Sequence, residues 1–329
     1  MANLIFKDHP VTWRTGHDFP EVPLTRISWD TAPDKAVAYV FFGHVNIDYD
    51  GSPTAYGPPG ISPMPDDDLS SAGNNKDGWF GVVALEKTHP LVQNGSAKID
   101  EKPWLLKKGK YPVVQQAKNG DPNPGYYVSG TPLQTGPSHL QNSYVDASQV
   151  SYGALSGGLR ALGFNLGDYG LALRHDQNLN SGFYFVDIGG AYTLGECSHK
   201  VGKNLGGSGR AGHFNNNFPV SFILFPESFD IDPNEGTPSI PDDQIRQALI
   251  PLLRNLSMAS NADELPLLMG FNETRPLTKP QGTSKLASYR QQPSRPRPAN
   301  YNNIVQGLSQ FGWTPLYTPT YTRALINWW

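Results

Sequence analysis

Two apolar runs joined by a polar turn restrict the fold of this chain more than any other feature. Apolar residues alternate with others in FNLGDYGLALR (164–174), and an aromatic-rich run follows in GFYFVDIGG (182–190). The segment between them, HDQNLNSG, has the composition of a turn. Because a period of two in hydrophobicity is typical of a half-buried β-strand, the sequence predicts a β-hairpin here. Its second strand would end on an acid, Asp187, followed by Ile188 and two glycines.

Further apolar runs predict that the chain up to about residue 228 is mostly β-structure. The other stretches in which we expect strands or strand ends are 36–48, 78–85, 126–133, 144–155 and 218–227. The 34 glycines and 30 prolines predict many turns and long connections. We therefore expect a mainly β domain over residues 1–228, with long loops.

The pattern changes in residues 229–329, which we interpret as a mixed C-terminal extension. Residues 239–258 predict a helix, with Asp242 as its cap and a kink at Pro251. Its apolar stripe consists of Ile245, Leu249, Leu252, Leu253 and Leu256. The segment RQQPSRPRPAN (290–300) resembles a proline-rich linker, and the apolar chain end is suited to docking.

The charge of the chain is unevenly distributed. The net charge is −3, and residues 271–329 hold seven Lys or Arg and one acid, so residues 1–270 carry −9. An acidic body attracts cationic substrates and repels polyanions, so we expect no nucleic-acid partner. The sparse basic tail is interpreted as a solvated or docking segment that could bind an export or particle component.

The single cysteine and the first residues of the chain indicate in which cellular compartment we expect the protein to be made. One cysteine, Cys197, excludes an intramolecular disulfide and fits synthesis in a reducing compartment. We expect it to be a small buried residue and not a nucleophile. The start, MANLIFKDHPVTWRT, lacks the pattern of a secretory leader, and no stretch approaches the ~20 apolar residues of a membrane span. We expect synthesis in the cytoplasm, no membrane partner, and release by a specialised export route or by lysis.

Two acids, Asp187 and Glu196, form the strongest candidate site. Asp187 ends the second strand of the hairpin, and Glu196 would open a short helix over residues 195–206 across a short loop. Two carboxyl groups that face one cleft can break a glycosidic bond, one as proton donor and the other as base or nucleophile. Burial against aromatic residues would keep the donor protonated near neutral pH. This spacing of carboxylates also arises by chance in turns.

A second acidic segment follows the first predicted strand. Asp48 and Asp50, in NIDYDGSP, are either a metal or substrate site or Asx turns at a strand end. The DDD run at 66–68 is interpreted as a solvated loop, and GGSGRAGHF (206–214) as a flexible flap. The eight histidines show no metal-binding spacing, so we expect no metal and no cofactor.

Several segments resemble glycoside hydrolase family 75, the fungal-type chitosanases and their bacterial relatives. They cover about residues 36–226 and include IDYDGSPTAYGP, DLSSAGNNKDGWFGV, DPNPGYYVSGTPLQ, YVDASQVSYGAL, LGDYGLAL, FVDIGGAYTLGECS and FPVSFILF. The most specific part is an Asp and a Glu nine residues apart with a G-E-x-S ending, at Asp187 and Glu196.

The resemblance implies a fold and a function. It implies a six-stranded double-psi β-barrel that cuts β-1,4-linked glucosamine polymers with inversion, Asp187 and Glu196 being the catalytic pair in either order of roles. Inversion requires the two carboxyl groups to be about 6.5–9.5 Å apart. The residues expected to contact the polysaccharide are Asp48, Asp50, Tyr56, Trp79 and Tyr184. Asp168 and Ser198 are expected to support the site, Asp168 in a structural or positioning role.

The chain departs from the resemblance in two ways that widen the range of functions. It lacks a secretory leader, and residues 227–329 match nothing in the family. The substrate could therefore be peptidoglycan glycan strands, which share the β-1,4 linkage. Two alternatives stay open: a lytic transglycosylase-like enzyme that forms an anhydro sugar, and a non-catalytic structural or binding protein of a phage or injection particle.

Overall fold

One large mixed sheet dominates the computed structural model. The structure describes residues 2–9, 13–15, 21–22, 24–73, 79–191, 193–208, 218–229, 239–273 and 300–314. Of the residues that the structure describes, 28% lie in strands and 22% in helices, so this part of the chain is mainly β, as the sequence predicted. The nine strands, in order across the sheet, are β1 (Leu4–Asp8), β4 (Thr25–Trp29), β5 (Ala32–Gly43), β15 (Val220–Leu224), β11 (Tyr169–Arg174), β12 (Leu179–Asp187), β10 (Tyr152–Ala154), β14 (Glu196–Ser198) and β6 (Asn46–Asp48).

The predicted hairpin forms the centre of this sheet. β11 and β12 pair antiparallel, with Tyr169 opposite Tyr184 and Arg174 opposite Leu179. β12 also pairs in parallel with β10, and β14 pairs in parallel with β6, whereas the other neighbours in the sheet are antiparallel. The hairpin is therefore confirmed, and Asp187 is the last residue of its second strand.

The two faces of the sheet have separate apolar cores. Along β12, Phe183 and Phe185 lie in one buried cluster, while Tyr184 and Val186 lie in another. This alternation follows from the period of two in a strand. The cluster that contains Phe183 also holds buried Cys197, in agreement with the prediction for that cysteine.

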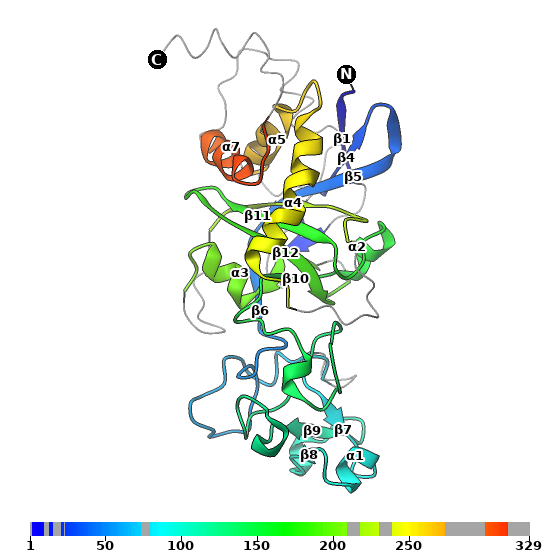
Figure 1. Ribbon diagram of the computed structural model, residues 1–329, viewed down its shortest axis with the longest axis vertical. Helices are drawn as coiled ribbons and strands as arrows, with labels where there is room; N and C mark the ends of the chain where they lie inside the picture. Colours follow the sequence, from blue (N-terminus) through cyan, green and yellow to red (C-terminus); the bar gives the residue numbers. More distant parts are fainter. Residues whose placement is uncertain are drawn as a thin grey trace.

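The C-terminal helices cover the face that carries Tyr184. They are α4 (Asp242–Ser257), α5 (Glu264–Glu273) and α7 (Tyr301–Ser309), and α4 crosses the hairpin in Figure 1. Ile245, Leu249, Leu253 and Leu256 of the predicted stripe are buried in the same cluster as Tyr184 and Val186, and Leu252 packs against it. The described part of the C-terminal extension thus shares a hydrophobic core with the β-rich domain.

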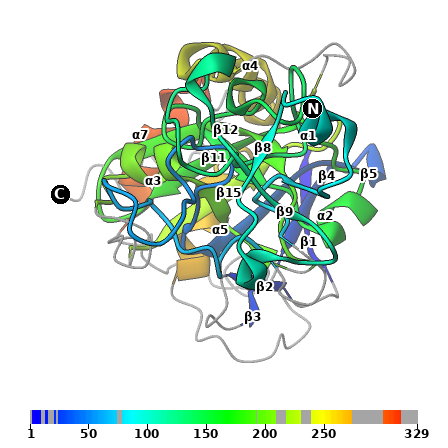
Figure 2. The same cartoon turned by 90° about the horizontal axis from the view of Figure 1, so that it is seen from below.

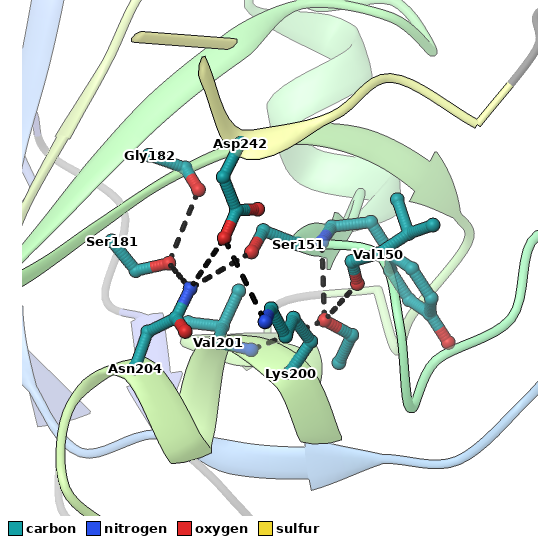
Figure 3. A network of polar contacts seen from close by, with 10 residues as sticks. Val150, Ser151, Ser181, Gly182, Lys200, Val201, Asn204 and Asp242 are labelled. Carbon is teal, nitrogen blue, oxygen red and sulfur yellow. Dashed lines mark hydrogen bonds and ion pairs between the residues drawn. The ribbon is translucent and has the colours of Figure 1, made fainter. Parts of the chain in front are cut away.

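The start of α4 is fixed by polar contacts with the preceding β-rich region. Nδ2 of Asn204 lies 3.1 Å from Oδ2 of Asp242 and 3.1 Å from the hydroxyl oxygens of Ser151 and Ser181 (Figure 3). Pro241 occupies the cap position, so the prediction that Asp242 is the cap was wrong by one residue. Asp242 instead lies in the first turn, where a carboxylate still interacts favourably with the helix dipole.

Residues 49–143 leave the sheet after β6 and return before β10, and they form a lobe of their own. The lobe contains the three-stranded sheet β7 (Ala84–Leu85), β9 (Tyr111–Val114) and β8 (Lys98–Ile99), the helix α1 (Pro90–Gln93) and long loops. Figure 1 shows it below the main sheet, and Figure 2 looks at the molecule from the side of this lobe. Two further apolar clusters pack inside it.

Several predicted elements are shorter or differently placed than expected. In its described part, the run 78–85 gives β7 and an isolated bridge at Val82. The run 126–133 gives isolated bridges at Tyr127 and Ser129, because prolines and glycines interrupt the pairing. The helix expected at 195–206 begins at His199 as α3 (His199–Asn204), capped by the hydroxyl of Ser198. Glu196 therefore belongs to a strand.

The remaining short elements are α2 (Gly157–Ala161), three 3-10 turns and a small sheet. The small sheet has the order β13 (Thr193–Leu194), β2 (Trp13–Thr15), β3 (Glu21–Val22). No described helix has the length and apolar character needed to cross a bilayer. Most of the predicted flap and of the proline-rich linker, and the whole apolar chain end, lie outside the described residues.

Candidate active site

Four carboxyl groups meet where the main sheet borders the lobe. Asp48 is the last residue of β6, Asp187 is the last residue of β12, and Glu196 is the first residue of β14. Carboxylate oxygens of Asp48, Asp50 and Asp187 all lie within 4.8 Å of one another. We call Asp48, Asp50, Asp187 and Glu196 the acid cluster.

The strand register explains how Asp187 and Glu196 come together. Ala154 of β10 is paired with Asp187 on one side, and its neighbour Gly153 is paired with Cys197 on the other. Because β10 and β14 are antiparallel, Glu196 lies next to Ala154 on the side opposite Asp187. Two inter-strand spacings, about 9–10 Å between Cα atoms, therefore separate the two acids across one short strand.

Hydrogen bonds orient the acid cluster. Asp187 donates a hydrogen bond to Asp48, and the backbone N–H of Asp50 donates to Oδ1 of Asp48 at 2.8 Å. The hydroxyl of Tyr152 lies 2.6 Å from the carbonyl oxygen of Asp50 and 3.2 Å from Oδ2 of Asp48. The hydroxyl of Tyr56 donates to Oδ1 of Asp50 at 2.7 Å. Asp48 thus accepts from the most donors, so it is the member best suited to carry a negative charge.

Burial raises the pKa of every member of the cluster, and repulsion from a neighbouring carboxylate adds to the rise for Asp50, Asp187 and Glu196. Burial is the main cause for each, and it raises the pKa of Glu196 to about 8, with the charge of Asp48 adding to the effect. The pKa values of Asp50 and Asp187 lie well above the ordinary value because burial is reinforced by the charge of Asp48. The pKa of Asp48 is also raised by burial, although its hydrogen bonds oppose the rise. Near neutral pH the cluster therefore retains protons that isolated carboxyl groups would lose.

No counter-charge offsets the cluster. Among the residues that the structure describes, no ion pair reaches any of its four members. The cluster is therefore a source of negative potential whenever one of its members ionises.

Glycine backbone closes on the acids from two directions. A side-chain carbon at Gly81, which comes from the lobe, would overlap with both carboxylate oxygens of Asp50. A side-chain carbon at Gly189, in the loop after β12, would overlap with Oε2 of Glu196. Both glycines allow the main chain to approach a carboxyl group directly and to exclude water from it.

Glu196 also lines a small apolar hollow with a cavity volume of about 10 Å³. The walls of the hollow include Phe183, Phe185 and Phe222 from the buried cluster that also holds Cys197. This setting accounts for the desolvation that raises the pKa of Glu196.

The cluster could also hold a cation, since Asp48, Asp50 and Asp187 can each offer a carboxylate oxygen to one point. Oxygen ligands of this kind suit hard divalent ions. A proton shared between Asp187 and Asp48, which are joined by a side-chain hydrogen bond, is the alternative way to satisfy these oxygens.

The three aromatic residues that were predicted to contact a substrate lie in different environments. Tyr56 is buried and holds Asp50 through its hydroxyl. Tyr184 has 0% of its surface exposed, and its hydroxyl accepts a hydrogen bond from the N–H of Ile240 at 3.4 Å. Tyr184 therefore lies in the core and offers no surface to a substrate, because the C-terminal segment covers that face of β12. Trp79 is partly buried in the lobe, with Nζ of Lys107 at 5.0 Å from its ring centroid.

The two predicted supporting residues stabilise the strands around the site. Oδ1 of Asp168 accepts a hydrogen bond from the N–H of Ser228 at 2.7 Å, and its Oδ2 accepts one from Asn165 at 2.8 Å. Asp168 was expected to have a structural or a positioning role, and these contacts to backbone N–H groups are those of a structural residue. The hydroxyl of Ser198, whose Cα is paired with that of Asp48, links β14 to β10. It donates to the carbonyl of Val150 and accepts from the N–H of Tyr152.

Sequence reasoning missed three contributors to the site. Tyr152 lies in a segment that was noted only as a strand end, and a lone tyrosine gives no signal of its partner. Asp67, interpreted as solvated, is partly buried, and its charge raises the pKa of Asp50. Gly81 was taken as an ordinary strand residue. Contacts between residues far apart in sequence account for all three omissions.

The fit of Gly81 against Asp50 can be tested by substitution. Gly81→Ala should lower the free energy of unfolding by about 1–3 kcal/mol, since the added methyl group cannot be accommodated without moving the backbone or the carboxylate. Denaturant unfolding measures the change. Gly157→Ala is the control, because a side-chain carbon there meets its nearest neighbour at an ordinary 3.6 Å. In the double variant Gly81→Ala/Asp50→Ala, the loss should be smaller than the sum of the single losses. Additive losses would contradict this close fit.

Neither a protein-family model nor a curated protein matches the chain.

Proposed function

We propose that the protein is an endo-acting glycoside hydrolase that cleaves β-1,4-linked amino-sugar polymers with inversion. The observation that carries the proposal is the placement of Glu196, whose pKa burial raises to about 8, and of the Asp187–Asp48 pair on either side of one strand. Acid/base hydrolysis of a glycoside needs one carboxyl group that is protonated and another that is ionised. Neighbouring carboxyl groups with different environments meet this need.

Glu196 has the properties of the general acid in this proposal. A pKa of about 8 leaves it protonated at neutral pH, so it can give a proton to the leaving glycosidic oxygen. The Asp187–Asp48 pair holds one proton, and its ionised partner can accept a second from water. The water oxygen then forms a bond to the anomeric carbon as the glycosidic C–O bond breaks. A Cα separation of two strand spacings is compatible with carboxyl groups about 6.5–9.5 Å apart, the separation that inverting enzymes use.

The strand order supports a double-psi β-barrel as the fold behind this site. Only His44 and Val45 separate β5 from β6, although β6 is the last strand of the sheet and β5 is the third. The strands from β5 through β15, β11, β12, β10 and β14 must therefore curve round toward β6. Residues of β5, β10, β12, β14 and β15 line the same apolar hollow, as the interior of a six-stranded barrel would.

The charge of the site favours glucosamine with free amino groups over N-acetylated sugars. The acid cluster has no ion-pair partner among the described residues, and Asp67 adds a further carboxyl group nearby. A protonated amino group would supply the missing positive charge. Chitosan is the expected substrate, and peptidoglycan glycan strands are the second candidate because they share the linkage.

The test is incubation of the purified protein with chitosan and, separately, with peptidoglycan sacculi, followed by mass spectrometry of the products. We expect chitosan oligomers with ordinary reducing ends. Products from sacculi that lack one water would indicate a lytic transglycosylase. No cleavage of either polymer would overturn the proposal and favour a structural or binding protein.

A further inference from the structure

Among the described residues, Phe80 is an exposed aromatic residue next in sequence to Gly81, which contacts the acid cluster. Its side chain is 69% exposed, and the next residue, Gly81, is the one whose backbone closes on the carboxylate of Asp50. On the sheet side, Ile188 follows Asp187 directly and is 44% exposed. Two exposed apolar residues therefore directly adjoin residues of the site in sequence, Phe80 in the lobe and Ile188 at the end of the sheet strand.

The described ends of its loop hold Phe80 in place. The N–H groups of Phe80 and Gly81 both donate to the carbonyl of Ala72, at 2.7 and 3.0 Å. The backbone of Gly73 lies against the ring, since a side-chain carbon there would be 2.6 Å from Cδ2 of Phe80. An exposed aromatic ring that is fixed in this way loses little conformational entropy when a ligand covers it.

A buried polar clamp fixes this loop relative to Asp50. The hydroxyl of Ser129 accepts from the N–H of Gly51 at 2.9 Å and donates to the carbonyl of Gly81 at 3.0 Å. Gln141 accepts from the N–H of Ser129 at 2.8 Å and donates to the carbonyl of Gly51 at 2.8 Å. Ser129 and Gln141 are both buried, so water does not compete for these hydrogen bonds. The position of Phe80 is thereby tied to the residue after Asp50.

The neighbouring residue, Trp79, differs from Phe80 in what contacts its ring. The Trp79 ring faces Lys107 and packs on the apolar cluster of the lobe. Among the described residues, no cationic side chain lies over the ring of Phe80. Its 69% exposure leaves ring surface available to a ligand.

We infer that Phe80, and not Trp79, is the aromatic platform on which a sugar unit of the polymer stacks beside the acid cluster. This inference rests on the proposed function. The apolar face of a pyranose can cover the ring, and a protonated amino group above it gains a cation–π attraction. Ser129 and Gln141 are positioning residues for this platform, since they hold its loop against Gly51.

The test compares Phe80→Ala, Phe80→Trp and a control, Met258→Ala, whose side chain is 53% exposed at the end of α4. With chitosan oligomers, Phe80→Ala should raise KM roughly tenfold while kcat stays within about twofold. Phe80→Trp should restore KM, and Met258→Ala should leave both constants unchanged. Calorimetric titration of a glucosamine oligomer into the Glu196→Gln variant, with and without Phe80→Ala, measures the same loss as binding.

The outcomes separate this inference from the proposed function. If the wild type cleaves chitosan and Phe80→Ala has an unchanged KM and affinity, the platform is refuted and the hydrolase stands. If Phe80→Ala lowers only kcat, Phe80 acts on the chemistry and the inference is also wrong. If the wild type neither cleaves nor binds the oligomers, the proposed function fails, and this inference fails with it.

Discussion

Glu196→Gln should reduce the turnover of chitosan by roughly 10²–10⁴-fold, because glutamine cannot donate the proton that the leaving oxygen requires. Glutamine has nearly the same shape as a protonated carboxyl group, so the fold should be preserved. Product release from chitosan measures the loss, and circular dichroism checks the fold. For the wild type, kcat should also fall as the pH rises through about 8, where Glu196 loses its proton.

Asp187→Asn should cause a loss of similar size for a different reason. Asparagine neither takes up nor releases a proton, so the Asp187–Asp48 pair loses one of its two titrating carboxyl groups and with it the means to take a proton from water. Glu86→Gln and Asp34→Asn are matched controls, since both side chains are exposed and lie outside the acid cluster. If either active-site variant retains turnover close to that of the controls, the assigned acid and base are wrong.

The same Glu196→Gln substitution should stabilise the protein at alkaline pH. In the folded protein, burial raises the pKa of Glu196 from about 4.5 to about 8. A tenfold difference in proton affinity between folded and unfolded states is worth about 1.4 kcal/mol, so ionisation of Glu196 costs at most about 5 kcal/mol of stability. Glutamine does not ionise and avoids this cost. We expect Tm at pH 8 to rise by about 4 °C or more.

The direction of the pH dependence follows from proton binding. Between pH 4.5 and 8, the folded state binds a proton at Glu196 that the unfolded state has released, so stability falls as the pH rises. The contribution of the buried acid is fully present below pH 4.5 and is lost as the pH passes through 8. The Tm of Glu196→Gln should therefore equal that of the wild type at pH 4 and exceed it increasingly toward pH 8.

Glu86→Gln again serves as the control, because its carboxyl group is exposed. Its Tm should follow that of the wild type at every pH. A Glu196→Gln variant that is less stable than the wild type at pH 8 would show that the carboxylate is not desolvated as the structure indicates. If Glu196→Gln is instead more stable at pH 8 and also loses turnover, Glu196 is a residue that lowers stability and supports turnover.

Local pattern was sufficient for the elements whose partners are close in sequence. The hairpin of β11 and β12 and the helix α4 follow from periods of 2 and 3.6 in apolar residues. The run 78–85 shows where this reasoning stops, because its valines resemble a strand but its pairing partners lie in distant parts of the lobe. The same limit applied to Glu196, which pairs with β6 at a separation of about 150 residues and so extends a sheet instead of opening a helix.

The sequence by itself determined the mainly β character, the central hairpin that ends on Asp187, and the presence of acids at the ends of strands. Only the tertiary structure decided that Asp48, Asp50, Asp187 and Glu196 share one buried cluster, and that Tyr184 does not take part in it. Periodicity reports which face of an element avoids water. Whether two strand ends meet depends on strand register and on the connections between strands. Both are set only when the chain packs, by residues that lie hundreds of ångströms apart along the extended chain.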